Sequence, residues 1–132
     1  MKQRLLILFL FSLISLPGFS QLGSLNVSLL GQLSYPADLN DVWGYVDSSG
    51  TEYALVGVFN GVSIVSLDNP ANPTELFFLP GVGSTWRDLK TWDDHAYVSN
   101  ESGDGLRIID LSDLPNSVNY RDTVIGGIST SH

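Results

Sequence analysis

The sequence contains no cysteine. Disulfide bonds, zinc sites built on thiolates and a lipid-modified cysteine behind an export signal are therefore excluded. Helical periodicity is also missing beyond the first twenty residues, where short apolar runs alternate with Gly, Pro, Asn and Asp. Runs of this length bounded by turn residues are typical of strands, so the sequence predicts an all-β protein that is stabilised by packing alone.

Basic residues are scarce, with 6 Lys and Arg against 14 Asp and Glu and a net charge of −8. Such a field repels phosphate backbones and anionic lipid surfaces, so nucleic acids and membrane surfaces are excluded as partners. A solvated exterior that keeps an exported β-protein soluble explains the charge. An acidic surface of this kind would also suit the binding of a divalent cation.

Residues 1–20 have the pattern of a signal peptide. Lys2 and Arg4 precede an apolar run over residues 5–16, and the segment Pro17-Gly-Phe-Ser20 that follows ends in a small residue. This run is shorter than the roughly 20 residues that span a bilayer, so we expect cleavage after Ser20 and no membrane insertion afterwards. A retained signal anchor is the alternative. The prediction is a secreted protein, extracellular or on the cell surface.

The rest of the chain repeats itself. Residues 52–70 return loosely as residues 95–115, and the match is clearest in one apolar run of each copy. The pairs at a spacing of 44 are Gly61 with Gly105, Val62 with Leu106, Ile64 with Ile108, Val65 with Ile109 and Leu67 with Leu111. A period of about 40 to 50 residues in a β pattern is typical of propeller blades and similar arrays.

Four apolar runs separated by turn residues make up each repeat. In the first repeat, Asn60-Gly61 lies between two of them and predicts a type I′ hairpin turn, because both residues tolerate a positive φ. The expected strands are 41–46, 53–59, 62–67 and 74–79 in the first repeat, and 88–92, 96–100, 106–111 and 120–125 in the second.

This pattern predicts a β-propeller-like array of four-stranded blades. Residues 21–40 form a lead-in strand region, 41–86 the first blade and 87–131 the second, and residue 132 begins an incomplete third. Propellers close with about four to eight blades, so we expect an amino-terminal fragment of a longer protein. A short open β-sandwich, or a chain that self-associates to complete its ring, is the alternative.

The repeated segments resemble a known group of sequences. Gly61–Pro70 with Pro73, and Gly105–Pro115, are similar to the LVIVD repeat, and the wider run over residues 26–132 is similar to the bacterial choice-of-anchor B family. The resemblance implies a secreted or surface-displayed β-propeller-like domain, with carboxy-terminal anchors that differ among members. It implies no established enzyme activity.

Residues at the blade starts are the candidates for a ligand site, since the innermost strands of a propeller line its channel. Asp41 and Asp88 mark equivalent starts, but they would equally serve to accept backbone N–H groups. His132 would add a neutral imidazole ligand for a metal. The predicted ligand-binding residues are Asn40, Asp41, Trp86, Arg87, Asp88 and His132.

One loop offers oxygen ligands of the kind that calcium prefers: Asn100, Glu101 and Asp104. Its spacing does not match the calcium-loop motif, and a Gly-rich hairpin connection explains it equally well. The expectation is therefore that the protein has no cofactor, with calcium as the one alternative. Acyl transfer has no support, because no Gly-x-Ser-x-Gly nucleophile elbow is present.

Tryptophans on an exported β-scaffold can stack on sugar rings. Trp43 and Trp92 lie in predicted strands and are expected to pack between blades, which leaves Trp86 as the exposed candidate. The sequence thus favours an acidic binding module without catalysis, whose partner is an extracellular protein or a carbohydrate. The alternatives are an exported metal-assisted hydrolase whose site is completed by further blades, and a structural adhesion segment.

Overall fold

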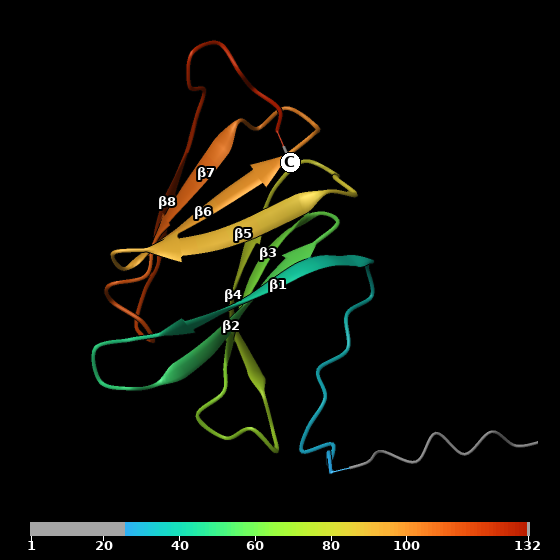
Figure 1. Ribbon diagram of the computed structural model, residues 1–132, viewed down its shortest axis with the longest axis vertical. Helices are drawn as coiled ribbons and strands as arrows, with labels where there is room; N and C mark the ends of the chain where they lie inside the picture. The colour runs from blue at the N-terminus through green and yellow to red at the C-terminus, as the bar shows by residue number, and fades with distance from the viewer. Residues whose placement is uncertain (1–25, 132) are drawn as a thin grey trace, which may run out of the picture.

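The computed structural model describes residues 26–131 (Figure 1). The predicted signal peptide and His132 lie outside these residues. Between residues 26 and 131 there is no helix long and apolar enough to cross a membrane.

The described chain folds into two four-stranded antiparallel sheets, which confirms the all-β prediction. In each sheet the strands follow one another in chain order, as a meander. The first sheet contains β1 (Leu39–Val46), β2 (Glu52–Val58), β3 (Gly61–Ser66) and β4 (Thr74–Pro80). The second contains β5 (Arg87–Trp92), β6 (His95–Asn100), β7 (Leu106–Asp110) and β8 (Asn119–Thr123).

The prediction of a type I′ turn at Asn60-Gly61 is wrong in two respects: the turn lies one residue earlier in the chain, and its backbone conformation is different. Val58 pairs with Gly61, so the two turn residues are Phe59 and Asn60, and neither has a positive φ. Gly61 is the first residue of β3, where a Cβ would lie 2.5 Å from the carbonyl oxygen of Leu79. The glycine is needed there for the close approach of β4.

A two-residue turn with two positive φ angles does occur, between β5 and β6. Trp92 pairs with His95, and Asp93 and Asp94 between them have φ values of 48° and 56°. Both values fit the type I′ turn, which suits the right-handed twist of a hairpin. Aspartate tolerates this conformation better than most residues do.

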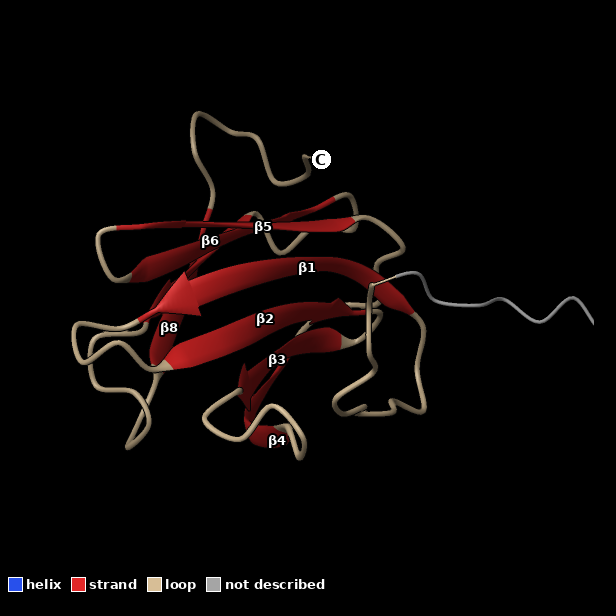
Figure 2. Cartoon of the chain, turned by 60° about the horizontal axis from the view of Figure 1, so that its bottom comes forward, coloured by secondary structure: helices blue, strands red, loops and turns tan. Residues whose placement is uncertain are grey.

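The two sheets lie one against the other (Figure 2), and the main core contains buried side chains from both of them. Leu55 and Ile64 from the first sheet, and Leu89, Val98 and Ile109 from the second, are each 0% exposed. Alternate residues of a strand point to opposite faces, so one face of each sheet supplies this core.

β1 and β5 lie side by side and run in the same direction (Figures 1 and 2). β5 also contacts β2, where a Cβ on Gly57 would lie 2.9 Å from the carbonyl oxygen of Arg87 and 3.1 Å from Leu89 Cδ1. The missing side chain at Gly57 thus sets how closely the sheets approach.

The opposite face of the first sheet is covered by the segment that precedes β1. Residues 26–38 form no strand. Leu33 and Tyr35 instead pack against Val56, Val58 and Val65 in a second, smaller core. The Tyr35 hydroxyl also lies 2.8 Å from Ser63 Oγ, which holds this segment on the sheet.

Candidate functional site

The two sheets meet at two ends with different properties. We call the end formed by residues 38–41, 58–61, 80–88 and 100–106 the strand-start end, because β1, β3, β5 and β7 begin there. The other, formed by residues 46–52, 66–74, 92–95 and 110–119, we call the pocket end. The predicted ligand-binding residues that the structure describes all lie at the strand-start end.

Asn40 and Asp41 tie the first sheet to the start of the second. Asn40 Nδ2 donates hydrogen bonds to the carbonyl oxygens of Ser84, at 3.3 Å, and Thr85. Asp41 Oδ2 accepts a hydrogen bond from the backbone N–H of Leu89 at 3.0 Å. This is the structural role that the sequence analysis left open for Asp41.

Arg87 is directed into the protein. It is 1% exposed, and it donates from Nε to the carbonyl oxygen of Val58 at 3.2 Å and from Nη2 to that of Val82 at 2.6 Å. Burial lowers the pKa of the Arg87 guanidinium, and the positive charge of Arg107 lowers it further. The side chain therefore clamps two carbonyl groups of the preceding sheet and its connection.

Glu101 holds the connection between the sheets. Its carboxylate accepts hydrogen bonds from Ser84 Oγ at 2.5 Å and from the backbone N–H groups of Thr85 at 3.0 Å and Trp86 at 3.1 Å. The Ser84 hydroxyl is the main cause of a lowered pKa for Glu101, and the two N–H groups add to it. The ionised carboxylate of Glu101 therefore has a structural role, because its hydrogen bonds hold the connection between the sheets.

The other predicted calcium ligands also accept hydrogen bonds from nearby N–H groups. Asn100 Oδ1 accepts from Ser102 at 2.8 Å and Gly103 at 3.0 Å, and Asp104 Oδ2 accepts from Val82 at 3.0 Å. Within residues 26–131, no group of three or more His, Cys, Asp or Glu side chains is arranged to hold a metal ion. Calcium binding at this loop stays a prediction.

Trp86 and Asp88 are exposed, Trp86 to 60%. The structure thus brings Asn40, Asp41 and Arg87 together around one inter-sheet connection and leaves Trp86 and Asp88 on the surface beside it.

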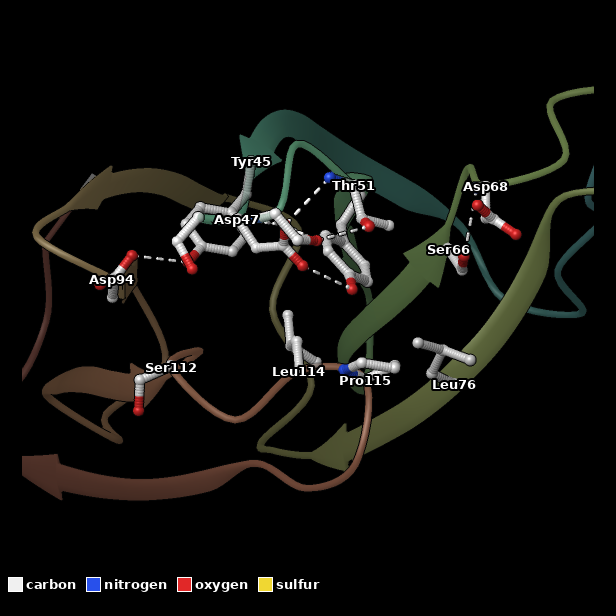
Figure 3. Close-up of a pocket in the computed structure, with 13 residues that line it drawn as sticks. Tyr45, Asp47, Thr51, Ser66, Asp68, Leu76, Asp94, Ser112, Leu114 and Pro115 are labelled. Atoms are coloured by element: carbon white, nitrogen blue, oxygen red, sulfur yellow. Dashed lines mark hydrogen bonds between the residues drawn. The ribbon is translucent and has the colours of Figure 1, made fainter.

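A cavity of about 530 Å³ opens at the pocket end, between the ends of the two sheets (Figure 3). Turns and strand ends of the first sheet form one side, and the β5–β6 turn and the β7–β8 connection form the other. Its lining residues are Tyr45, Asp47, Ser48, Ser49, Thr51, Tyr53, Ser66, Asp68, Leu76, Asp94, Ser112, Leu114 and Pro115.

Two tyrosine–aspartate pairs lie in this cavity (Figure 3). The Tyr45 hydroxyl donates to Asp94 Oδ1 at 2.7 Å, which links the two sheets, and the Tyr53 hydroxyl donates to Asp47 Oδ2 at 3.1 Å. Burial, followed by the neighbouring carboxylate, raises the pKa of both tyrosines. Both phenols are therefore protonated donors at neutral pH.

Asp47 also fixes the turn that forms the rim of the cavity. Its Oδ1 accepts hydrogen bonds from the Ser49 N–H at 2.8 Å, the Ser49 hydroxyl at 2.7 Å and the Thr51 N–H at 2.9 Å. These bonds, that of the Ser49 hydroxyl first, lower the pKa of Asp47. The rim is therefore preorganised, with an ionised carboxylate at its centre.

The cavity combines an apolar floor with hydroxyl and carboxylate walls. Leu76, Leu114 and Pro115 supply apolar surface, while Asp68 and Ser112 are exposed beside it. No Lys or Arg is among the lining residues. Such a site can accept hydrogen bonds from a ligand with several hydroxyl groups, and it repels anions.

A second hollow of about 370 Å³ adjoins the cavity on the side of β5. Tyr45 and Asp94 line both hollows. Trp92 lines the second hollow and is 76% exposed, so the expectation that Trp92 packs between blades is wrong. Burial alternates along β5, and Trp92 lies on the exposed face with Asp88 and Lys90, opposite the face that supplies Leu89 to the core.

Trp43 behaves differently from Trp92 because it lies beside the second sheet. Its Nε1 donates to Thr91 Oγ1 at 3.0 Å, and Lys90 Nζ lies 3.9 Å from the centre of its ring. It bridges β1 and β5 and is 36% exposed. The packing role expected for Trp43 is therefore partly realised.

Sequence reasoning did not find the cavity, although it identified the turns that form it. Asp47, Asp68 and Asp94 lie between the expected strands and were not among the predicted ligand-binding residues. One feature of the sequence could have indicated the cavity: in each repeat an aspartate, Asp47 or Asp94, lies in the turn after the first expected strand. The sequence does not show, however, that these two turns face each other.

Comparisons of the chain with family models, with curated proteins and with solved structures find no match. The fold and the geometry of the pocket end are therefore the basis for a functional proposal.

Proposed function

We propose that this chain is the binding module of a secreted or cell-surface protein, and that it holds a neutral carbohydrate in the cavity at the pocket end without catalysis. Its two sheets are neighbouring blades of a β-propeller-like array, of the kind that the resemblance to LVIVD repeats and the choice-of-anchor B family implies.

The way the sheets stack supports the array. Val62 and Ile64 are 0% exposed and face the second sheet. Their counterparts in the repeat, Leu106 and Ile108, lie on the far face of that sheet, because Ile109 fills the inter-sheet core and neighbouring residues point to opposite faces. The face of the second sheet that carries Leu106 and Ile108 therefore points away from the first sheet, in the direction in which a next blade would be added. This is the orientation expected in an array of stacked blades.

The lining of the cavity carries the carbohydrate proposal. Sugars present hydroxyl groups around an apolar ring face, and the cavity presents carboxylates and hydroxyls above Leu76, Leu114 and Pro115. The volume of about 530 Å³ lies within the usual range for small-ligand sites, about 300 to 1,000 Å³. The absence of a lining cation disfavours sugars with acidic groups.

Asp47 is suited to accepting hydrogen bonds from a ligand and not to acting as the acid of a glycosidase. A glycosidase needs one carboxyl group with a raised pKa to protonate the leaving oxygen. The pKa of Asp47 is lowered by its hydrogen bonds, so this group stays ionised and acts as an acceptor.

The test is calorimetric titration of the purified chain with a panel of neutral oligosaccharides and with matched oligosaccharides that contain uronic acids. We expect a neutral glycan to bind and its acidic counterparts to bind at least tenfold more weakly. Asp68→Ala removes an exposed acceptor of the cavity and should weaken binding about tenfold, which corresponds to roughly 1.4 kcal/mol.

Asp38→Ala is the matched control, because Asp38 is exposed at the strand-start end. Its affinity should equal that of the wild type. Failure of every neutral glycan to bind, or binding that Asp68→Ala leaves unchanged, would overturn the proposal. Release of reducing sugar that EDTA abolishes would favour the metal-assisted hydrolase instead.

A further inference from the structure

We infer that Trp92 forms a second sugar subsite beside the cavity, so that the ligand is a chain of at least two sugar units. This inference rests on the proposed carbohydrate binding and extends it to the size of the ligand.

The two hollows adjoin each other at the pocket end. The cavity and the hollow beside β5 share Tyr45 and Asp94 as lining residues. These two side chains are joined by the 2.7 Å hydrogen bond between the sheets. A ligand that occupies both hollows must therefore cross the Tyr45–Asp94 pair, which makes this pair the boundary between two subsites.

Trp92 has the exposure and the position that a stacking platform needs. Its side chain is 76% exposed, and Val46, which lines the same hollow, is 57% exposed. Contiguous apolar surface that is open to water is typical of an interaction site, and here Trp92 and Val46 supply it together. The flat indole can cover the apolar face of a sugar ring, while Asp93 and Asp94 provide acceptors for its hydroxyl groups.

The backbone next to Trp92 is held in place. Trp92 pairs with His95 in the β5–β6 ladder across the Asp93–Asp94 turn. His95 Nδ1 lies 2.7 Å from the carbonyl oxygen of Asp93, and this contact links the two ends of the short turn. The hairpin backbone that carries Trp92 is thus fixed before binding, so binding has to order only the indole side chain.

The experiment compares ligands of increasing length on two tryptophan variants. The neutral glycan identified in the titration above is used as its monosaccharide, disaccharide and tetrasaccharide. Trp92→Ala should weaken binding of the tetrasaccharide about tenfold and leave the affinity for the monosaccharide within twofold of the wild type. Intrinsic fluorescence of Trp92 should change on adding the tetrasaccharide, and this change should be absent in Trp92→Ala.

Trp86→Ala is the matched variant at the strand-start end and should bind every ligand as the wild type does. A loss with Trp86→Ala and none with Trp92→Ala would overturn the inference and favour the site predicted from the sequence. Tetrasaccharide binding that depends on Asp68 but not on Trp92 would overturn the second subsite alone. If no length of glycan binds, the proposed function itself is wrong.

Discussion

The strand-start end and the pocket end both carry aspartates, but in different settings. At the strand-start end, Asp41, Arg87 and Glu101 each bind backbone groups of another element. At the pocket end, Asp68 and Ser112 line an open cavity. Residue type alone therefore does not distinguish a structural contact from a candidate ligand site.

The route of the chain explains the difference. Residues 81–86 cross from the first sheet to the second at the strand-start end and bring backbone donors and acceptors between the sheets. At the pocket end, every described turn returns to the sheet it left. No backbone crosses the gap there, so the space between the sheets remains open and the Tyr45–Asp94 hydrogen bond spans it.

The largest effect is expected from Arg87→Ala, which tests whether the strand-start end holds the sheets together. The substitution leaves the carbonyl groups of Val58 and Val82 without this donor and empties a fully buried site. We expect the free energy of unfolding in urea to fall by about 3 kcal/mol.

Arg121→Ala is the control for Arg87, since Arg121 is exposed on β8. It should change the free energy of unfolding by less than about 0.5 kcal/mol. An equal fall in the free energy of unfolding for the two variants would show that the buried guanidinium does not hold the sheets together. The strand-start end would then not be the structural end of the molecule.

A smaller effect is expected from Tyr45→Phe at the pocket end. It removes the hydroxyl that donates to Asp94, while the exposed carboxylate is left to water. Losing this one bond should cost about 1 kcal/mol of unfolding free energy in urea. Tyr97→Phe, on the far face of β6, is the control and should be nearly neutral. A loss for Tyr45→Phe as large as that for Arg87→Ala would contradict the comparison.

The strands were predictable because each run is short, apolar and bounded by turn residues. Most ends fall within one or two residues of the expectation, and Pro70 and Pro73 lie in the connection between β3 and β4 as expected. The hairpin at Phe59-Asn60 was misplaced because the glycine of the Asn-Gly pair serves the approach of β4, a contact between strands that the local turn rule does not include.

The site was not predictable in the same way, because it depends on how two turns face each other across the sheets. Asp47 and Asp94 are 47 residues apart, and each has a sufficient local explanation as a turn residue. Trp92 was expected to be buried because it lies in a predicted strand, but it falls on the exposed face of β5. Only the packing of one sheet on the other shows which side chains border empty space.

The smallest effect at neutral pH, and the most specific one, is expected from Glu101→Gln. The pKa of Glu101 in the folded protein lies below its ordinary value of 4.5, chiefly because the Ser84 hydroxyl donates to the carboxylate. The folded protein therefore takes up this proton less readily than the unfolded chain does, and acid favours unfolding.

The stabilisation from Glu101 should thus be complete above pH 4.5 and be lost as the pH falls through the lower folded value. Urea unfolding of the wild type and of Glu101→Gln at pH 7, 5, 4 and 3 measures this. The variant should be less stable at pH 7, and the gap should close on acidification. Glu52→Gln, at an exposed position at the start of β2, should follow the wild type at every pH. A gap that stays constant down to pH 3 would mean that the charge of Glu101 does not hold the connection between the sheets, and that the strand-start end depends on its buried arginine.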